Sequence, residues 1–236
     1  MSLPDQLPIL PLSDKVLLPS IITNYVLSDA EAKHLLRGDF IVCIPLMKTT
    51  RGNTTAGLND DLSRLYHFGC TAEILKVDQS LPGTTVLHVQ GLCRSRVTDI
   101  LYEGTFFEAL LTHHFVMDDD DGQEKDEYNR NNACTSNKVN QETNADQFRI
   151  LCNEYITRMQ ELGIADAILS QLTRSMTNQP LSNIISLLLY LTESTTFDDK
   201  LSALETVHYQ RLLELGNKMV SCHLQVRMHG TFPFRK

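Results

Sequence analysis

The hydrophobic pattern of this chain changes its period once, and this change constrains the fold more than any other feature. Up to residue 117, apolar residues come in short runs or alternate with polar ones, as is typical of β-strands. From residue 147 to residue 230 they recur at steps of three and four, as in amphipathic helices. Strands followed by helices in separate blocks predict an α+β protein. The expected organisation is a β subdomain (1–117), an acidic insertion (118–146), a helical subdomain (147–230) and a tail (231–236).

Local signals in the first half define several of the expected elements. Residues 40–47 form a continuous apolar run, which predicts a strand buried on both faces. Pro82 and Gly83 suit the two central positions of a turn, because glycine accepts the positive φ of the second position. This turn is expected to join strands 69–77 and 84–90 into a hairpin. A capping box from Ser28 to Glu31 predicts a short helix, with Gly38 at its end.

The residues after Gly91 alternate in polarity, which predicts a strand with one solvated face. Arg94 and Arg96 fall on the same face of this strand. Two neighbouring arginines can clamp an anion, but on a solvated strand face they more often have no ligand. We therefore expect both side chains to be exposed, and we interpret Gly69 and Gly91 as turn glycines.

The segment 118–146 differs from the rest of the chain in its charge. It holds nine acidic and three basic residues and accounts for most of the net charge of −8. Such a segment buries too little apolar surface to offset the entropy lost on ordering, which predicts a disordered insertion. Its four consecutive aspartates lack the EF-hand spacing, so a solvated loop is preferred to a calcium site. The shortage of basic residues argues against nucleic acid as a partner.

No motif in the sequence predicts a catalytic, cofactor-binding or metal-binding residue. The glycines of 52–57 have phosphate-loop spacing, but no lysine follows the second one. His67-x-x-Cys70 and His113-His114 lack the second ligand pair that structural zinc needs. A Cys–His nucleophile is unsupported and G-x-S-x-G is absent. Six scattered cysteines without a secretory leader indicate a reducing, intracellular compartment, and no apolar run is long enough to predict a membrane partner.

Three segments in the first half, and two in the second, resemble the amino-terminal domain of Lon-type ATP-dependent proteases. They are Leu7-Pro-Ile-Leu-Pro-Leu12 with 14–19, Gly69-Cys-Thr-Ala-Glu-Ile74, Gly91-Leu-Cys-Arg-Ser-Arg-Val97, Gln179-Pro-Leu181 and 200–215. Residues 102–111 also look like the next strand of that domain. The resemblance covers nearly the whole chain outside the acidic segment and looks closest to the peroxisomal branch of Lon. It implies a PUA-like, mostly antiparallel β-barrel followed by an α-helical bundle.

The same resemblance implies a function without catalysis. In the family this region binds unfolded or damaged protein substrates and helps the protease assemble, whereas the ATPase and the Ser–Lys peptidase lie downstream. The expected function is therefore protein quality control by a binding module, which could self-associate or associate with a Lon-type protease. No binding residue can be named. The expected compartment is the peroxisomal matrix or the cytoplasm.

Two alternatives remain open from the sequence. The chain could be the amino-terminal fragment of an ATP-dependent serine protease. It could also be a ubiquitin-ligase substrate receptor of the cereblon kind, which shares this domain. The second alternative requires a carboxyl-terminal zinc domain with paired C-x-x-C motifs, and the sequence contains no such motif.

Overall fold

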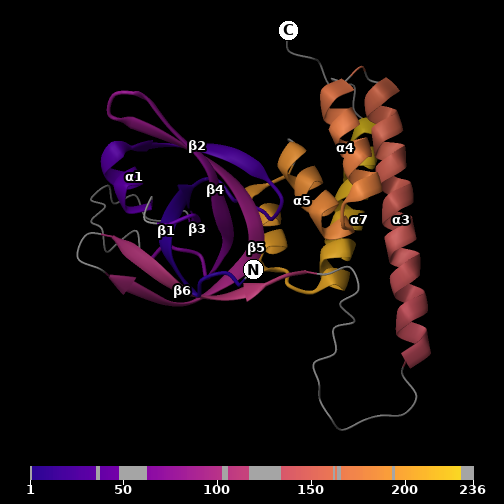
Figure 1. Cartoon of the computed structure of the whole chain (residues 1–236). Coiled ribbons are helices and arrows are strands. Elements are labelled where there is room, and N and C mark those ends of the chain that lie inside the picture. Colours follow the sequence, from indigo (N-terminus) through magenta and orange to yellow (C-terminus); the bar gives the residue numbers. More distant parts are fainter. Residues whose placement is uncertain are drawn as a thin grey trace. The chain divides into compact units, whose positions relative to one another are not determined.

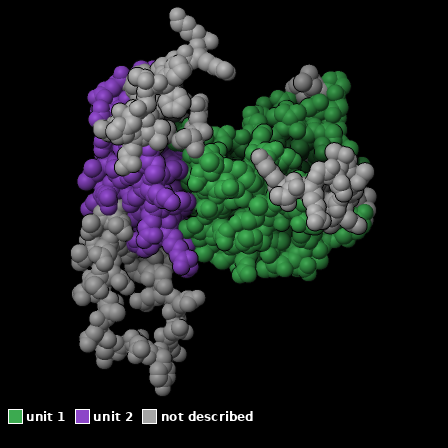
Figure 2. All heavy atoms as spheres, turned by 180° about the vertical axis from the view of Figure 1, so that it is seen from behind, with its two compact units in different colours: residues 1–115, 189–207 green, residues 116–188, 208–236 purple. Residues whose placement is uncertain are grey.

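A computed structural model describes most of the chain and has the α+β architecture that the sequence predicts (Figure 1). The described residues are 2–35, 38–47, 63–102, 106–116, 134–161, 163, 166–192 and 195–229. The chain divides into two compact units, coloured separately in Figure 2. Unit 1 consists of Met1–Phe115 and Leu189–Val207, and unit 2 of Val116–Leu188 and His208–Lys236. No helix among the described residues is both long and apolar enough to span a membrane.

Unit 1 is built on a six-stranded sheet that closes on itself. The strands are β1 (Gln6–Ser13), β2 (Ile22–Ser28), β3 (Phe40–Leu46), β4 (Phe68–Leu81), β5 (Thr84–Tyr102) and β6 (Phe107–His114). Their order is β2-β5-β4-β3-β1-β6, and a further pairing of β5 with β6 closes five of them into a barrel. All pairs are antiparallel except β1 with β3. In this order β2 pairs only with β5, so it is the edge strand among the described residues.

Buried apolar side chains from three strands of the barrel form one cluster. These are Leu7 and Ile9 of β1, Val42 and Ile44 of β3, and Ala109 and Leu111 of β6. The predicted double-sided burial of β3 is confirmed, because every residue from Ile41 to Leu46 is buried. The predicted hairpin is also confirmed: Leu81 pairs with Thr84 across the turn, and Gly83 has a φ of 77°.

Gly69 and Gly91 lie inside strands, so their interpretation as turn glycines is wrong. Both are required by close packing of the chain. A Cβ atom on Gly69 would lie 2.9 Å from the Cys43 carbonyl oxygen, and one on Gly91 would lie 2.4 Å from the Leu18 carbonyl oxygen. Side chains larger than hydrogen would therefore collide with a neighbouring backbone segment.

The short helix α1 (Asp29–Leu35) begins at the predicted capping box. The Ser28 backbone N–H donates to the Glu31 carboxylate at 2.9 Å, and the Glu31 N–H donates to the Ser28 hydroxyl at 3.3 Å. Ala32 and Leu35 are the buried residues of α1, which ends before Gly38. The box holds the start of α1 next to the end of β2, an arrangement that shapes the candidate site described below.

The helices of the second half follow the predicted apolar periodicity. They are α3 (Cys134–Glu161), α4 (Asp166–Asn178), α5 (Leu181–Leu191), α6 (Phe197–Glu205) and α7 (Tyr209–His229). Gly163 has the expected positive φ, 70°, and its N–H donates to the Gln160 carbonyl oxygen at 3.0 Å. In unit 2, Phe148 of α3 and Ile185 of α5 both lie close to Gly216 of α7, since a Cβ atom there would lie about 3 Å from each.

Two boundaries differ from those expected from sequence. Helix α3 begins at Cys134, so residues 134–146 of the predicted disordered insertion are helical in the structure. Residues 118–133 lie outside the described part of the chain. The second difference is that Leu189–Val207, which includes α6, belongs to unit 1 rather than to the helical unit. Its contacts with the barrel, described below, account for this placement.

Candidate functional site

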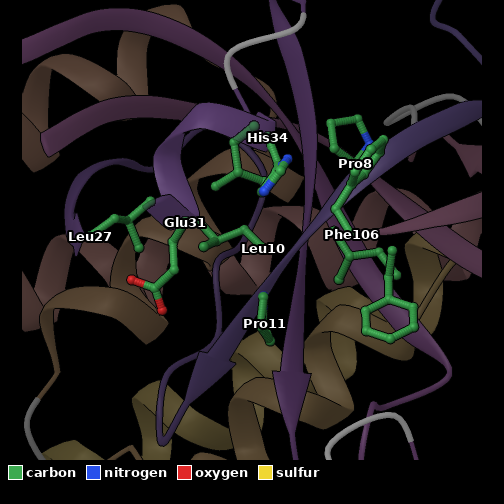
Figure 3. A pocket seen from close by; sticks show the side chains of 10 residues that line it. Pro8, Leu10, Pro11, Leu27, Glu31, His34 and Phe106 are labelled. Atoms are coloured by element: carbon green, nitrogen blue, oxygen red, sulfur yellow. The ribbon is translucent and has the colours of Figure 1, made fainter. Parts of the chain in front are cut away.

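A partly apolar groove opens in unit 1 between β1, α1 and the start of β6. Its volume is about 180 Å³. The lining residues are Pro8, Ile9, Leu10, Pro11, Leu27, Glu31, His34, Leu35, Phe106 and Phe107. Figure 3 shows Leu10 and Pro11 of β1 in the middle of these side chains, with Leu27, Glu31 and His34 around them on one side and Phe106 on the other. We call this site the α1 groove.

The size of the α1 groove limits what it can hold. An apolar protein cavity of about 150 Å³ accommodates a benzene molecule. The α1 groove is slightly larger, so it has room for one bulky apolar side chain. Alternation along β1 places Leu7 and Ile9 on one face, in a buried cluster, and Leu10 on the opposite face, and both Ile9 and Leu10 reach the groove.

Two polar side chains, His34 and Glu31, line the groove together with the apolar ones. The His34 ring stacks on the Phe106 ring, with centroids 5.2 Å apart and planes at 14°. His34 Nδ1 is buried and has no hydrogen-bond partner among the described residues. Hydrogen bonds from the Ser28 hydroxyl and backbone N–H lower the pKa of Glu31, which keeps this exposed carboxylate ionised at neutral pH.

Apolar surface continues beside the groove. Tyr102 at the end of β5 is 60% exposed, and its ring packs against the Phe107 ring with centroids 5.0 Å apart. Contiguous exposed apolar surface of this kind is typical of sites that bind another polypeptide. The groove and its aromatic rim can therefore bind apolar side chains, and none of their residues forms a catalytic arrangement.

Arg94 does not lie where the sequence predicts. It is 2% exposed, whereas Arg96 is exposed, so the expected solvated pair does not exist. The Arg94 Nε–H donates to the Ala203 carbonyl oxygen at 2.9 Å, near the carboxyl end of α6, where a cation is favoured. Burial lowers the pKa of Arg94 to about 10, so the guanidinium stays charged at neutral pH.

A second contact holds the same end of α6. The Tyr66 hydroxyl, which lies just before β4, donates to the Glu205 carboxylate. His67 Nε2 lies 3.8 Å from the other oxygen of that carboxylate. Together with Arg94 these contacts attach α6 to the barrel, which explains why it belongs to unit 1. They also place the His67 ring beside the Glu205 carboxylate.

One arrangement of reactive side chain types occurs inside the barrel wall. His113 Nδ1 lies 2.9 Å from the Ser95 hydroxyl and 3.8 Å from Cys93 Sγ, and its Nε2 lies 2.8 Å from the Pro4 carbonyl oxygen. The carbonyl oxygen can only accept, so Nε2 carries the proton and Nδ1 accepts from Ser95. Ser95 is fully buried and no substrate can reach it. This network therefore ties the amino-terminal segment to the barrel.

Four of the described thiols are buried, whereas the Cys222 thiol on α7 is exposed and has no catalytic partner described beside it. Cys43, Cys70, Cys93 and Cys152 are buried, and burial raises the pKa of each thiol. A thiol becomes a nucleophile only as the thiolate, which burial disfavours. Among the described residues no group of three or more His, Cys, Asp or Glu side chains could hold a metal ion.

Comparison with solved structures defines the class of fold. The chain is similar to the N-terminal domain of a Lon protease from the Mycobacterium avium complex. The TM-score is 0.60 at 16% identity, and the similarity covers 92% of this chain and 99% of the other. It is also similar to a Lon N-terminal domain protein from Xanthomonas campestris, with a TM-score of 0.55 at 16% identity over 92% and 97% of the two chains. Its fold is that of Lon N-terminal domains.

The family model extends this conclusion from fold to family. Residues 6–221 match the substrate-binding domain of ATP-dependent protease La (Lon). The chain therefore belongs to the Lon substrate-binding domain family, as the resemblance of its sequence motifs implies. Comparison with curated proteins gives no match. The family is described as a substrate-binding domain.

Proposed function

We propose that this chain binds unfolded or damaged polypeptides for protein quality control, and that the α1 groove holds one of their apolar side chains. The family supplies the general activity, substrate binding. The observation that carries the proposal is the groove itself, because it is apolar, open and sized for one side chain. Unfolded polypeptides are the natural ligands of such a site, since they expose the bulky apolar residues that folded proteins bury.

The groove has features that suit a polypeptide better than a small apolar molecule. The exposed Glu31 carboxylate, which lines the groove, can accept a hydrogen bond from a peptide N–H. Tyr102 and Phe107 extend the apolar surface beyond the groove, so neighbouring residues of the same polypeptide can also be bound. One pocket with an aromatic rim gives affinity without selecting a particular sequence, as quality control requires.

Leu27→Glu is expected to weaken binding of a permanently unfolded protein at least about tenfold, because burying one such side chain contributes about 1.5–3 kcal/mol. Leu27 is half-buried and lines the groove, so its replacement puts a charge into the apolar site. The measurement is the Kd for fluorescently labelled, reduced and carboxymethylated α-lactalbumin, followed by anisotropy.

Val26→Glu is the matched control for Leu27→Glu. Val26 is the preceding residue of β2, is 70% exposed and does not line the groove. Its replacement adds the same charge to the same strand and should change the Kd by less than about twofold. Equal loss of affinity in the two variants would place binding outside the α1 groove and contradict the proposal.

The description of the family model favours a second possibility, in which the same domain is the substrate-binding part of an ATP-dependent protease. An immunoblot of the native protein distinguishes the two. A band near 26.7 kDa indicates a separate binding module, which could self-associate or deliver substrates to a Lon-type protease. A band several times larger indicates a protease with further domains. Microscopy of the same cells tests the expected peroxisomal or cytoplasmic location.

A further inference from the structure

A second cavity in unit 1 differs from the α1 groove in its chemistry. Its volume is about 320 Å³. The residues that line it come from the loop after β1, from β2, from the end of α5 and from the start of α6. They are Asp14, Lys15, Val16, Leu17, Thr23, Tyr25, Tyr190, Thr195, Phe197 and Lys200. We call this site the lysine pocket.

Two cations in the lysine pocket are positioned over aromatic rings. Lys15 Nζ lies 5.8 Å from the centroid of the Tyr25 ring, and Lys200 Nζ lies 6.0 Å from that of Tyr190. Contact with the ring faces favours these positions of the ammonium groups. Asp14 is the one carboxylate among the residues that line the pocket, so the two lysines give this lining a net positive charge. At the nearby start of α6, the Asp199 carboxylate is held by the Thr196 hydroxyl and N–H.

Hydroxyl groups add neutral donors to these cations. The Thr23 hydroxyl lies 3.5 Å from the Tyr190 hydroxyl. Burial is the main cause that raises the pKa of Tyr25, with smaller contributions from Cys43, Cys70 and Tyr190, so the Tyr25 hydroxyl stays protonated and can donate. Ammonium groups together with protonated hydroxyls form a donor set that suits a compact anion with several acceptor oxygens.

The lysine pocket and the α1 groove lie along the same two segments of the chain. Residues 8–11 line the groove and 14–17 line the pocket. On the other segment, Leu27 lines the groove while Tyr25 and Thr23 line the pocket, all three on one face of β2. The two sites therefore lie near opposite ends of β2. The step from Leu27 to Thr23 is four residues, or about 13 Å of extended chain.

We propose that the lysine pocket binds a carboxylate of the same polypeptide whose apolar side chain occupies the α1 groove. The preferred substrate segment then has a bulky apolar residue and an acidic group about four positions apart, in an extended conformation. The acidic group can be an aspartate or glutamate side chain or a free carboxyl terminus. This inference rests on the proposed function and narrows its substrate class.

Short peptides test the preferred spacing directly. The reference peptide carries leucine and glutamate four positions apart in a Gly/Ser background, in both orders, with blocked ends. We expect replacement of the glutamate by glutamine to weaken binding about threefold to fivefold, and replacement by lysine to weaken it further. A peptide that ends in a free carboxylate at the glutamate position is compared with its amide, which distinguishes the two sources of the acidic group.

Protein variants show whether the effect arises in the lysine pocket. Lys15→Gln and Lys200→Gln should each reduce the preference for glutamate over glutamine. Lys76→Gln, which removes an exposed charge of β4, should leave it unchanged. The lysine pocket proposal is wrong if all peptides with leucine bind equally well regardless of the acidic group. It is also wrong if neither pocket variant alters the preference for glutamate. In both cases the proposal that the α1 groove binds the leucine side chain is unaffected. If no peptide with leucine binds, the proposed function fails as well.

Discussion

Gly91→Ala is expected to lower the free energy of unfolding by about 3 kcal/mol, a large fraction of the roughly 5–15 kcal/mol that stabilises a native domain. A Cβ atom at this position would lie 2.4 Å from the Leu18 carbonyl oxygen and 2.9 Å from Cys70 Sγ. The clash cannot be relieved by a side chain rotation, since the nearest atom belongs to the backbone. The measurement is chemical denaturation followed by circular dichroism.

Hydrogen bonds explain why the backbone near Gly91 cannot move away. The Ser20 N–H donates to the Gly91 carbonyl oxygen at 2.8 Å, and the Gly91 N–H donates to the Ile21 carbonyl oxygen at 2.9 Å. A shift that made room for a methyl group would break both. Gly38→Ala is the matched control, because a Cβ atom there has nothing within 4 Å. Its stability should change by less than about 1 kcal/mol. Similar stability of the two variants would show that close packing at Gly91 is not required.

Arg94→Ala is expected to destabilise the β-barrel unit by about 3 kcal/mol. The substitution removes a side chain that is almost fully buried, and it leaves the Ala203 carbonyl oxygen without its donor. Because α6 is attached to the barrel through this contact, its loss also loosens Lys200 and Phe197 of the lysine pocket. Denaturant unfolding measures the stability, and the leucine–glutamate peptide measures the effect on binding.

Arg96→Ala provides the control for Arg94→Ala. Arg96 lies two residues further along β5 and is exposed, so its replacement should change stability by less than about 0.5 kcal/mol. Arg94→Met separates the contribution of packing from that of the hydrogen bond, because methionine restores much of the buried volume but donates no hydrogen bond. An equal effect of alanine at positions 94 and 96 would mean that the buried guanidinium contributes nothing to stability.

The fold could largely be predicted because its signals are local. The continuous apolar run of β3, the Pro82-Gly83 turn and the capping box of α1 each depend on a few neighbouring residues. The periodicity of α3 to α7 likewise depends on spacing within each helix. Polar composition is a weaker guide. It suggested disorder up to residue 146, whereas the structure has α3 from Cys134 onward, continuous with the periodic segment that starts near Phe148.

The burial of Arg94 could not be predicted because it depends on a distant segment. Alternation along β5 places Arg94 and Arg96 on one face, but it does not show that α6 covers only the first of them. Gly91 is a similar case: the sequence identifies a glycine, whereas the reason for it is the Leu18 carbonyl oxygen more than seventy residues away.

The α1 groove could not be found from sequence for a related reason. Its lining residues come from β1, the end of β2, α1 and the start of β6, and most are ordinary apolar residues that resemble core positions in sequence. The lysine pocket is also assembled from separate segments, with Lys15 and Lys200 at opposite ends of the chain. Neither site contains a motif, so only the folded chain shows them.

Site-specific photo-crosslinking tests the central claim most directly. A photoreactive phenylalanine derivative replaces Tyr102 at the rim of the α1 groove or, as control, exposed Ile150 on α3. Unfolded carboxymethylated α-lactalbumin should crosslink strongly at position 102 and weakly at 150, and native α-lactalbumin at neither. Excess unlabelled unfolded protein should abolish the crosslink at 102. Equal yields at the two positions, or equal yields with native and unfolded protein, would contradict binding of unfolded polypeptides in the groove.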